Sequence, residues 1–294
     1  MLFTIAIPTY NNEKTILRTI KSCVNQSFDD EYEVLVVNNA STDNTKKILQ
    51  SLVDLKIRII ENKENVSLFE NHNICLKEAK GEYVIFCHSD DELKIEALKI
   101  LKEKLRSRNY PKRYIIWGQS MFRDFYEYLK QFNVLYNTII SGERAIQIFA
   151  IPNGLTPSGT CYSRKSLLEI GGFYKMKTRT TPSDWTIMLN AALNEFEFEM
   201  LDRLLFVRKF ASTAIGRNNK EIKRDIKDAF SEFLENQTIE NKEIVRNNLL
   251  MTYNNLSYML LNKFFKIKFK IKIKYLLKIA YFYPKEIIRI LLKR

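Results

Sequence analysis

Apolar and polar residues alternate in blocks along the first part of the chain. Four apolar runs have the length and β-branched content of buried strands: LFTIAI (2–7), YEVLVV (32–37), KIRII (56–60) and EYVIFC (82–87). Segments with helical character lie between and after them, over 12–25, 42–53, 67–79 and 92–106. Strands that alternate with helices over short links predict an α/β fold, with a mostly parallel, Rossmann-like sheet and helices on its faces.

The pattern continues beyond residue 110 with wider spacing. A strand is expected over 114–118, and helices over 142–149, before Gly171-Gly172 and over 183–196. Two amphipathic helices are expected over 219–234 and 240–265. We therefore predict two regions, an α/β domain over 1–212 and a helical, basic, amphipathic region over 213–294.

Polar clusters follow each of the first four predicted strands. They are PTYNN (8–12), NNASTDN (38–44), ENKEN (61–65) and HSDDE (88–92). The carboxyl ends of parallel strands share one edge of a sheet, and ligands of open α/β sheets bind outside that edge. The sequence therefore predicts one ligand site built from these four loops.

The net charge of +13 is concentrated in the tail. Residues 263–294 contain eleven Lys or Arg and one acid, which leaves +3 for the other 262 residues. Strict alternation over 265–273 predicts a strand, and the rest of the tail predicts a helix broken at Pro284. An amphipathic cationic segment favours an anionic membrane surface. A dimerisation face or a solvated helix face is the alternative, and the uneven charge argues against nucleic acid.

Cysteine and histidine usage argues against a structural zinc site. The four cysteines lack CxxC spacing, and the chain has two histidines. The N-terminal segment has no basic region before its short apolar run, and no run of 18 apolar residues occurs. These features predict a cytoplasmic protein with reduced thiols, held at the inner face of the cell membrane by its tail.

Three segments carry a resemblance to a known family. TIAIPTYNNEKTILRTIKSCVNQSF, EVLVVNNASTDNT and GEYVIFCHSDDEL resemble, in order and spacing, the inverting family 2 glycosyltransferases of the GT-A fold. The resemblance covers about residues 1–205. It implies transfer of a sugar from a nucleotide diphosphate sugar, with a divalent cation, Mn²⁺ or Mg²⁺, as cofactor.

The HSDD segment resembles the Asp-x-Asp metal motif of that family. Asp90 is the expected ligand, with Asp91 beside it, and a cation would offset the repulsion between the two carboxylates. His88 stands where many members have the first Asp, so it is a metal ligand, a ribose contact or neither. The alternative is that both acids cap the helix expected over 92–106.

The first loop resembles the part of the family that holds the nucleobase. Pro8, Thr9, Tyr10 and Asn11 are therefore expected to bind the donor through main chain and side chains.

Three further residues are expected at the donor. Asn38 and Asn39 stand where many relatives carry two aspartates, and an amide oxygen also accepts a pyrimidine N3–H, which favours uracil or thymine. A turn with a helix cap is the alternative for this segment. His72 falls where relatives often have Arg, so it is either a weak phosphate contact or a solvated or otherwise satisfied histidine.

Asp184 resembles the carboxylate that starts the acceptor-side helix of the family. In an inverting transfer it would remove the proton of the acceptor hydroxyl. A helix N-terminus is expected to lower its pKa and keep it ionised. The alternatives are an ordinary cap for Asp184, and either sugar stacking or core packing for Trp185.

The resulting prediction is an inverting hexosyltransferase that uses a UDP- or dTDP-type donor. Its expected acceptor is a glycan, carried on a lipid, in the synthesis of a surface polysaccharide or glycoconjugate. A degenerate nucleotide-sugar-binding module at a membrane is the alternative, because His88, His72 and Asn38 depart from the family pattern. An oligomer is compatible with either function.

Overall fold

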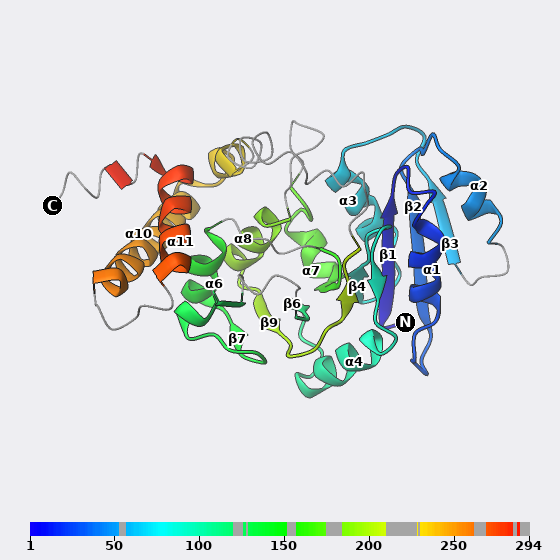
Figure 1. Cartoon of the computed structure of the whole chain (residues 1–294), viewed down its shortest axis with the longest axis horizontal. Coiled ribbons are helices and arrows are strands. Elements are labelled where there is room, and N and C mark those ends of the chain that lie inside the picture. Colours follow the sequence, from blue (N-terminus) through cyan, green and yellow to red (C-terminus); the bar gives the residue numbers. More distant parts are fainter. Residues whose placement is uncertain are drawn as a thin grey trace.

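The computed structural model describes most of the chain (Figure 1). The described residues are 1–52, 57–119, 126–127, 129–151, 157–174, 184–209, 228, 230–261, 269–284 and 287–288. The predicted boundary at 212–213 lies outside them.

A mixed sheet forms the centre of the molecule (Figure 1). Its strands among the described residues are β1 (Phe3–Thr9), β2 (Tyr32–Asn38), β3 (Ile57–Glu61), β4 (Tyr83–Phe86), β6 (Tyr114–Trp117), β7 (Ile139–Ile140), β8 (Thr160–Ser163) and β9 (Glu197–Met200). They are arranged in the order β3-β2-β1-β4-β8-β6-β9-β7. β8 and β7 run antiparallel to their neighbours, and the remaining pairs are parallel. The mostly parallel sheet predicted from the alternating pattern is confirmed.

Helices cover both faces of this sheet. They are α1 (Ile16–Val24), α2 (Thr45–Gln50), α3 (Leu68–Glu78), α4 (Ala97–Ser107), α6 (Gly142–Phe149), α7 (Arg164–Glu169) and α8 (Thr186–Leu193), with a 3₁₀ turn over Lys130–Phe132. Successive strand residues point to opposite faces. Ile5 of β1 therefore joins one apolar cluster with α1 and α4, and Ala6 joins the other cluster with α3, α6 and α8.

The segment after β4 differs from the predicted helix over 92–106. Glu92–Leu93 form a short strand, β5, which pairs antiparallel with β10 (Phe206–Val207), and α4 begins only at Ala97. Asp90 and Asp91 therefore lie in a turn before a strand, and the alternative that they cap the helix is wrong.

The C-terminal region is helical, as predicted, with α10 (Ile239–Leu261) beside α11 (Phe269–Phe282). The strand expected over 265–273 is wrong for 269–273, which belong to α11, and 265–268 lie outside the described residues. α11 ends just before Pro284, where the break was predicted. Among the described helices, none combines the length and apolarity needed to cross a bilayer.

The C-terminal region packs against the α/β part of the chain. α10 contacts α6, and the Tyr283 hydroxyl donates a 2.6 Å hydrogen bond to the Ala150 carbonyl. The Phe230 ring lies 4.7 Å from that of Trp185 and 5.0 Å from that of Tyr283. The two regions therefore share one apolar cluster.

Candidate active site

The loops after β1 and β2 lock together at the carboxyl edge of the sheet. Asn11 adopts a left-handed backbone conformation, with φ of 53°, and its side-chain oxygen accepts a 2.8 Å hydrogen bond from the Thr42 backbone N–H. Tyr10 is 40% exposed beside it, while Pro8 and Thr9 are buried in β1. Within the described part of the chain, the buried Thr9 hydroxyl has no hydrogen-bond partner. This edge therefore offers one open aromatic ring and one unsatisfied hydroxyl.

Asn39 is a structural junction between two loops. Its amide nitrogen donates 2.9 Å hydrogen bonds to the Asn65 side chain and the Val66 carbonyl. Its oxygen accepts 2.9 Å hydrogen bonds from the Asn62 side chain and the Val66 N–H. These four bonds use the two donor hydrogens and the two acceptor lone pairs of the amide side chain. Asn39 therefore shapes the site, and its geometry does not favour the predicted direct contact with a base.

Asn38 is fully buried and similarly engaged. Its nitrogen donates to the Glu61 carboxylate at 3.0 and 3.1 Å, and its oxygen accepts from the Ser41 hydroxyl at 2.5 Å. A base could bind this amide only if one of these bonds were exchanged. The alternative of a tight turn describes this segment better, with Asp43 accepting from the Thr45 N–H ahead of α2.

The HSDD turn directly follows β4 and is held from several sides. The Asp91 N–H donates to the His88 carbonyl at 2.9 Å, and the Asp91 carbonyl accepts a 2.7 Å bond from Thr19 of α1. The buried Asp91 carboxylate accepts from the Ser158 hydroxyl and, at 3.1 Å, from the Lys209 N–H. These bonds connect the turn to the segments flanking β8 and β10.

His88, Asp90 and Asp91 form a cluster that fits a divalent cation. One ligand atom from each residue lies within 4.8 Å of the others. Burial, assisted by the negative charge of Asp90, raises the pKa of Asp91 to about 6. A bound cation would offset both the burial of the Asp91 carboxylate and its repulsion by Asp90, because it replaces lost hydration and neutralises the like charges.

His72, on α3, lies behind this cluster and is fully buried. Its Nε2 lies 3.1 Å from His88 Nε2, and its Nδ1 lies 2.8 Å from the Leu68 carbonyl oxygen. The predicted direct contact with a donor phosphate is not favoured by this buried position. The structure instead brings His72 into contact with a predicted metal ligand.

Asp184 lies just before α8, with Trp185 as the N-cap residue. Burial raises the pKa of Asp184 to about 7, although the backbone N–H groups of Asp184 and Trp185 oppose the rise. The expected lowering by the helix N-terminus is therefore wrong, because burial is the stronger effect. Trp185 is buried against Phe230, so core packing is its role.

Arg208 connects the predicted metal ligands with the predicted base. It follows β10, and its positive charge acts on His88, Asp91 and Asp184, lowering the pKa of each. Burial and this charge together lower the pKa of His88 to about 4. No sequence motif pointed to Arg208. Its only signal was a cation after a short apolar stretch, FVRK.

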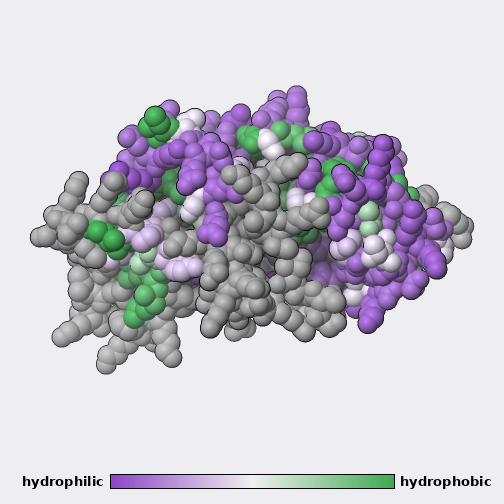
Figure 2. Space-filling view, turned by 90° about the horizontal axis from the view of Figure 1, so that it is seen from above, coloured by the Kyte–Doolittle hydropathy of each residue, from purple (hydrophilic) through white to green (hydrophobic). Residues whose placement is uncertain are grey.

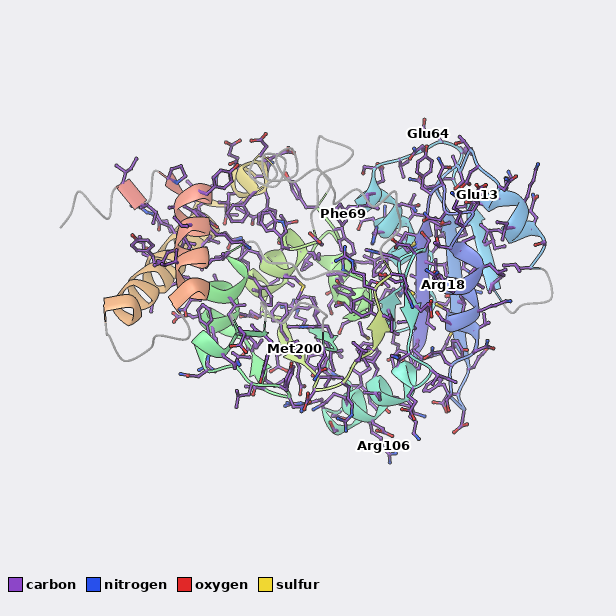
Figure 3. All side chains as sticks on the ribbon, in the orientation of Figure 1. Glu13, Arg18, Glu64, Phe69, Arg106 and Met200 are labelled. Carbon is purple, nitrogen blue, oxygen red and sulfur yellow. The ribbon has the colours of Figure 1, made fainter. Side chains whose placement is uncertain are left out.

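The loops after β1, β2 and β3 meet at one edge of the sheet. Glu13 and Glu64, from the loops after β1 and β3, lie at this edge in Figure 3, and Arg106 of α4 lies at the opposite end. Glu13 accepts a 3.0 Å bond from the Asn44 N–H, which again joins the loops after β1 and β2. The expectation that these loops form one site agrees with this arrangement.

Proteins of known sequence resemble about a third of this chain. The chain is 38% identical over 103 residues to the poly(ribitol-phosphate) beta-N-acetylglucosaminyltransferase TarS of Staphylococcus aureus, covering 34% of this chain and 18% of TarS. It is 33% identical over 110 residues to the putative teichuronic acid biosynthesis glycosyltransferase TuaG of Bacillus subtilis, covering 37% of this chain and 43% of TuaG. The matches thus span less than half the length of either relative.

Solved structures share the fold over nearly the whole chain. The crystal structure of Staphylococcus aureus TarS with UDP-GlcNAc superposes with a TM-score of 0.65 at 21% identity, covering 96% of this chain and 80% of that one. The mannosyltransferase PcManGT of Pyrobaculum calidifontis, with GDP-Man and Mn²⁺, gives 0.61 at 17% identity, covering 95% and 86%. The family model of glycosyl transferase family 2 matches residues 4–170, more than half of the chain. The chain therefore belongs to glycosyl transferase family 2.

Proposed function

We propose that this chain is an inverting, metal-dependent glycosyltransferase of the hexosyltransferase type. It moves a sugar from a UDP- or dTDP-type donor to a lipid-linked glycan acceptor in surface polysaccharide or glycoconjugate synthesis. Family membership and the names of relatives support this, among them a GalNAc(5)-diNAcBac-PP-undecaprenol beta-1,3-glucosyltransferase of Campylobacter jejuni, 36% identical over 103 residues. The observation that carries the proposal is the charge of Arg208, which acts on His88 and Asp91 of the metal cluster and also on Asp184.

The donor base binds at the end of β1. The exposed ring of Tyr10 stacks on the base, and the unsatisfied hydroxyl of Thr9 gains a partner. Asn11, Asn38 and Asn39 keep the loops in this shape through the hydrogen bonds that join them. The site is largely preformed, so that little conformational entropy is lost on donor binding.

The diphosphate binds beside the HSDD turn. His88, Asp90 and Asp91 would hold Mn²⁺ or Mg²⁺, and the bound ion would stabilise the negative charge of the departing diphosphate. Arg208 adds a fixed positive charge next to this cluster. The same charge favours binding of the anionic donor.

Asp184 removes the proton of the acceptor hydroxyl. The hydroxyl oxygen attacks the anomeric carbon, the bond from that carbon to the diphosphate oxygen breaks, and the proton passes to the Asp184 carboxylate. A pKa of about 7 suits this role, because a general base works best when its pKa is near the working pH.

Transfer and binding assays test the proposal. We expect UDP- or dTDP-sugar consumption with Mn²⁺ and a lipid-linked glycan, loss of turnover with a chelator, and loss of turnover in Asp90→Asn. Thermal shift with UDP and Mn²⁺ reports binding separately, because a bound ligand raises the melting temperature. Binding without turnover in any donor and acceptor combination would favour the degenerate binding module instead.

A second proposal concerns the membrane surface. Ile279 and Tyr283 are buried against the rest of the chain, whereas Leu277, Tyr281 and Ile288 are 64%, 43% and 55% exposed. Leu277 and Tyr281 lie one turn apart on α11 and therefore share a face. Exposed hydrophobic groups are visible at the end of the molecule formed by α10 and α11 (Figure 2). Together with the basic tail, this face suits the cytoplasmic surface of an anionic membrane.

Vesicle co-sedimentation tests this second proposal. Vesicles with anionic lipid should retain the protein at low salt, and purely zwitterionic vesicles should not. Replacing Leu277, Tyr281 and Ile288 together by Ser should weaken retention, whereas Ile239→Ser, at a residue 78% exposed on α10, should not. If the triple variant instead changed only the oligomeric state, the tail would be a dimerisation face.

A further inference from the structure

His72 and His88 occupy two positions where this chain departs from the family pattern, and the structure brings them together. Their Nε2 atoms lie 3.1 Å apart, and their rings meet at an angle of 89°. His72 comes from α3 and His88 from the turn after β4. Two departures that meet at hydrogen-bonding distance act as one unit.

The hydrogen bonds assign the protons of this pair. His72 Nδ1 lies 2.8 Å from the Leu68 carbonyl oxygen, which can only accept, so Nδ1 carries a proton. The His72 ring is fully buried among aromatic rings, where a charged imidazolium is strongly disfavoured, so the ring is neutral. Its Nε2 is then an acceptor, and His88 donates through Nε2–H. The remaining lone pair of His88 lies on Nδ1.

Aromatic rings hold the His72 ring in place. The rings of Phe69, Phe86 and Phe173 lie 5.3, 4.9 and 5.2 Å from it, centroid to centroid. The His72 side chain is fully buried. A ring enclosed in this way keeps its orientation, and the acceptor that it presents to His88 is fixed.

On the basis of the proposed function, we infer that His88 is a third metal ligand that binds through Nδ1 beside Asp90 and Asp91. His72 is the positioning residue that selects this tautomer of His88. Histidine ligands commonly use their second nitrogen in such a bond, and its loss typically costs 10- to 100-fold in metal affinity. An imidazole nitrogen also favours Mn²⁺ over Mg²⁺, so that this pair sets the metal preference.

Electron paramagnetic resonance tests the ligand set directly. Mn²⁺ is added to the full chain, alone and with UDP, and free Mn²⁺ gives the affinity while pulsed spectra detect coupling to ¹⁴N. We expect ¹⁴N coupling in the unmodified chain and its loss in His88→Ala. His88→Asp should narrow the preference for Mn²⁺ over Mg²⁺ by about tenfold in competition.

Two variants of His72 separate positioning from packing. His72→Phe fits the aromatic surroundings but removes the acceptor, and it should weaken Mn²⁺ binding about 10-fold or more. His72→Gln keeps an acceptor for His88 and should restore most of the affinity. Thermal unfolding checks that each variant is folded, and His88→Ala carries the test if His72→Phe does not fold.

Each outcome has a defined meaning. Mn²⁺ that binds without ¹⁴N coupling, or that binds His88→Ala and His72→Phe as tightly as it binds the unmodified chain, would overturn the inference while leaving the metal-dependent function intact. The complete absence of Mn²⁺ binding with UDP present would overturn both. Loss of affinity in His72→Phe that His72→Gln does not restore would reject the positioning role.

Discussion

Replacing Asp184 by Asn should stop turnover and, at the same time, stabilise the fold at alkaline pH. Asn has nearly the same shape, and its oxygen still accepts from the N–H groups of Asp184 and Trp185 that the carboxylate uses. It has no basic carboxylate, however, and loss of a general base typically lowers the rate by about 10²- to 10⁴-fold. Donor binding should be nearly unchanged, because Asp184 acts on the acceptor.

The pH dependence follows from the raised pKa. With a pKa of about 7, about a tenth of Asp184 is ionised at pH 6 and about nine tenths at pH 8, so turnover should rise about tenfold over this interval. The stability of the fold changes with pH in the opposite direction. The folded-state pKa lies above the ordinary 3.8, so the folded state binds the proton more tightly, and stability falls as the pH rises from about 4 to about 7.

The size of this stability effect can be worked out. A change from 3.8 to about 7 corresponds to about 4 kcal/mol. Partial exposure of the side chain reduces this to about 2 kcal/mol, or about 4 °C in melting temperature. Asp184→Asn should therefore match the unmodified chain near pH 4 and exceed it at pH 8.

Rate profiles and urea unfolding at several pH values measure both effects. Retained turnover in Asp184→Asn would remove Asp184 as the base. A stability difference that did not change with pH would show that burial does not raise the pKa of this carboxylate.

Three further predictions use the same preparations. Arg208→Gln removes a charge that lowers the pKa of Asp184, so the rise of turnover with pH should move to higher pH; an unmoved profile would contradict this coupling. Tyr10→Ala should weaken UDP binding about tenfold in calorimetry through loss of stacking. Tyr110→Ala, at a similarly exposed ring after α4, should not weaken it, and equal effects would exclude stacking. Asn39→Ala breaks four partly buried hydrogen bonds and should cost about 3 kcal/mol in urea unfolding, against about 1 kcal/mol for Asn65→Ala, which breaks one of them; similar losses would contradict the junction role.

The sheet and its ligand edge were predictable because their signals are local. Each of the first four strands is a short apolar run, and the polar loops follow directly in the sequence. The start of α4 was not predictable in this way. Glu92–Leu93 are strand because they pair with Phe206–Val207, which lie far away in the sequence.

Contacts between distant segments explain why the sequence does not show how Asn39 and His72 are held. In the sequence Asn39 resembles a donor contact, but in the fold its amide is occupied by hydrogen bonds with Asn62, Asn65 and Val66. His72 contacts His88 because α3 packs beside the turn after β4. The strand predicted in the tail was wrong over 269–273 for another reason. Alternation of Lys and apolar residues suits a strand, but a lone strand leaves its backbone groups unpaired, whereas the helix over 269–273 satisfies its own.

The aromatic contacts from Trp185 through Phe230 to Tyr283 have a practical consequence for protein production. Removing the basic C-terminal segment, as is often done to help crystallisation, would expose apolar side chains beside the helix that follows Asp184. Such shortened versions should precipitate more readily than the intact polypeptide. For the same reason, gene fusions and purification handles belong at the opposite terminus.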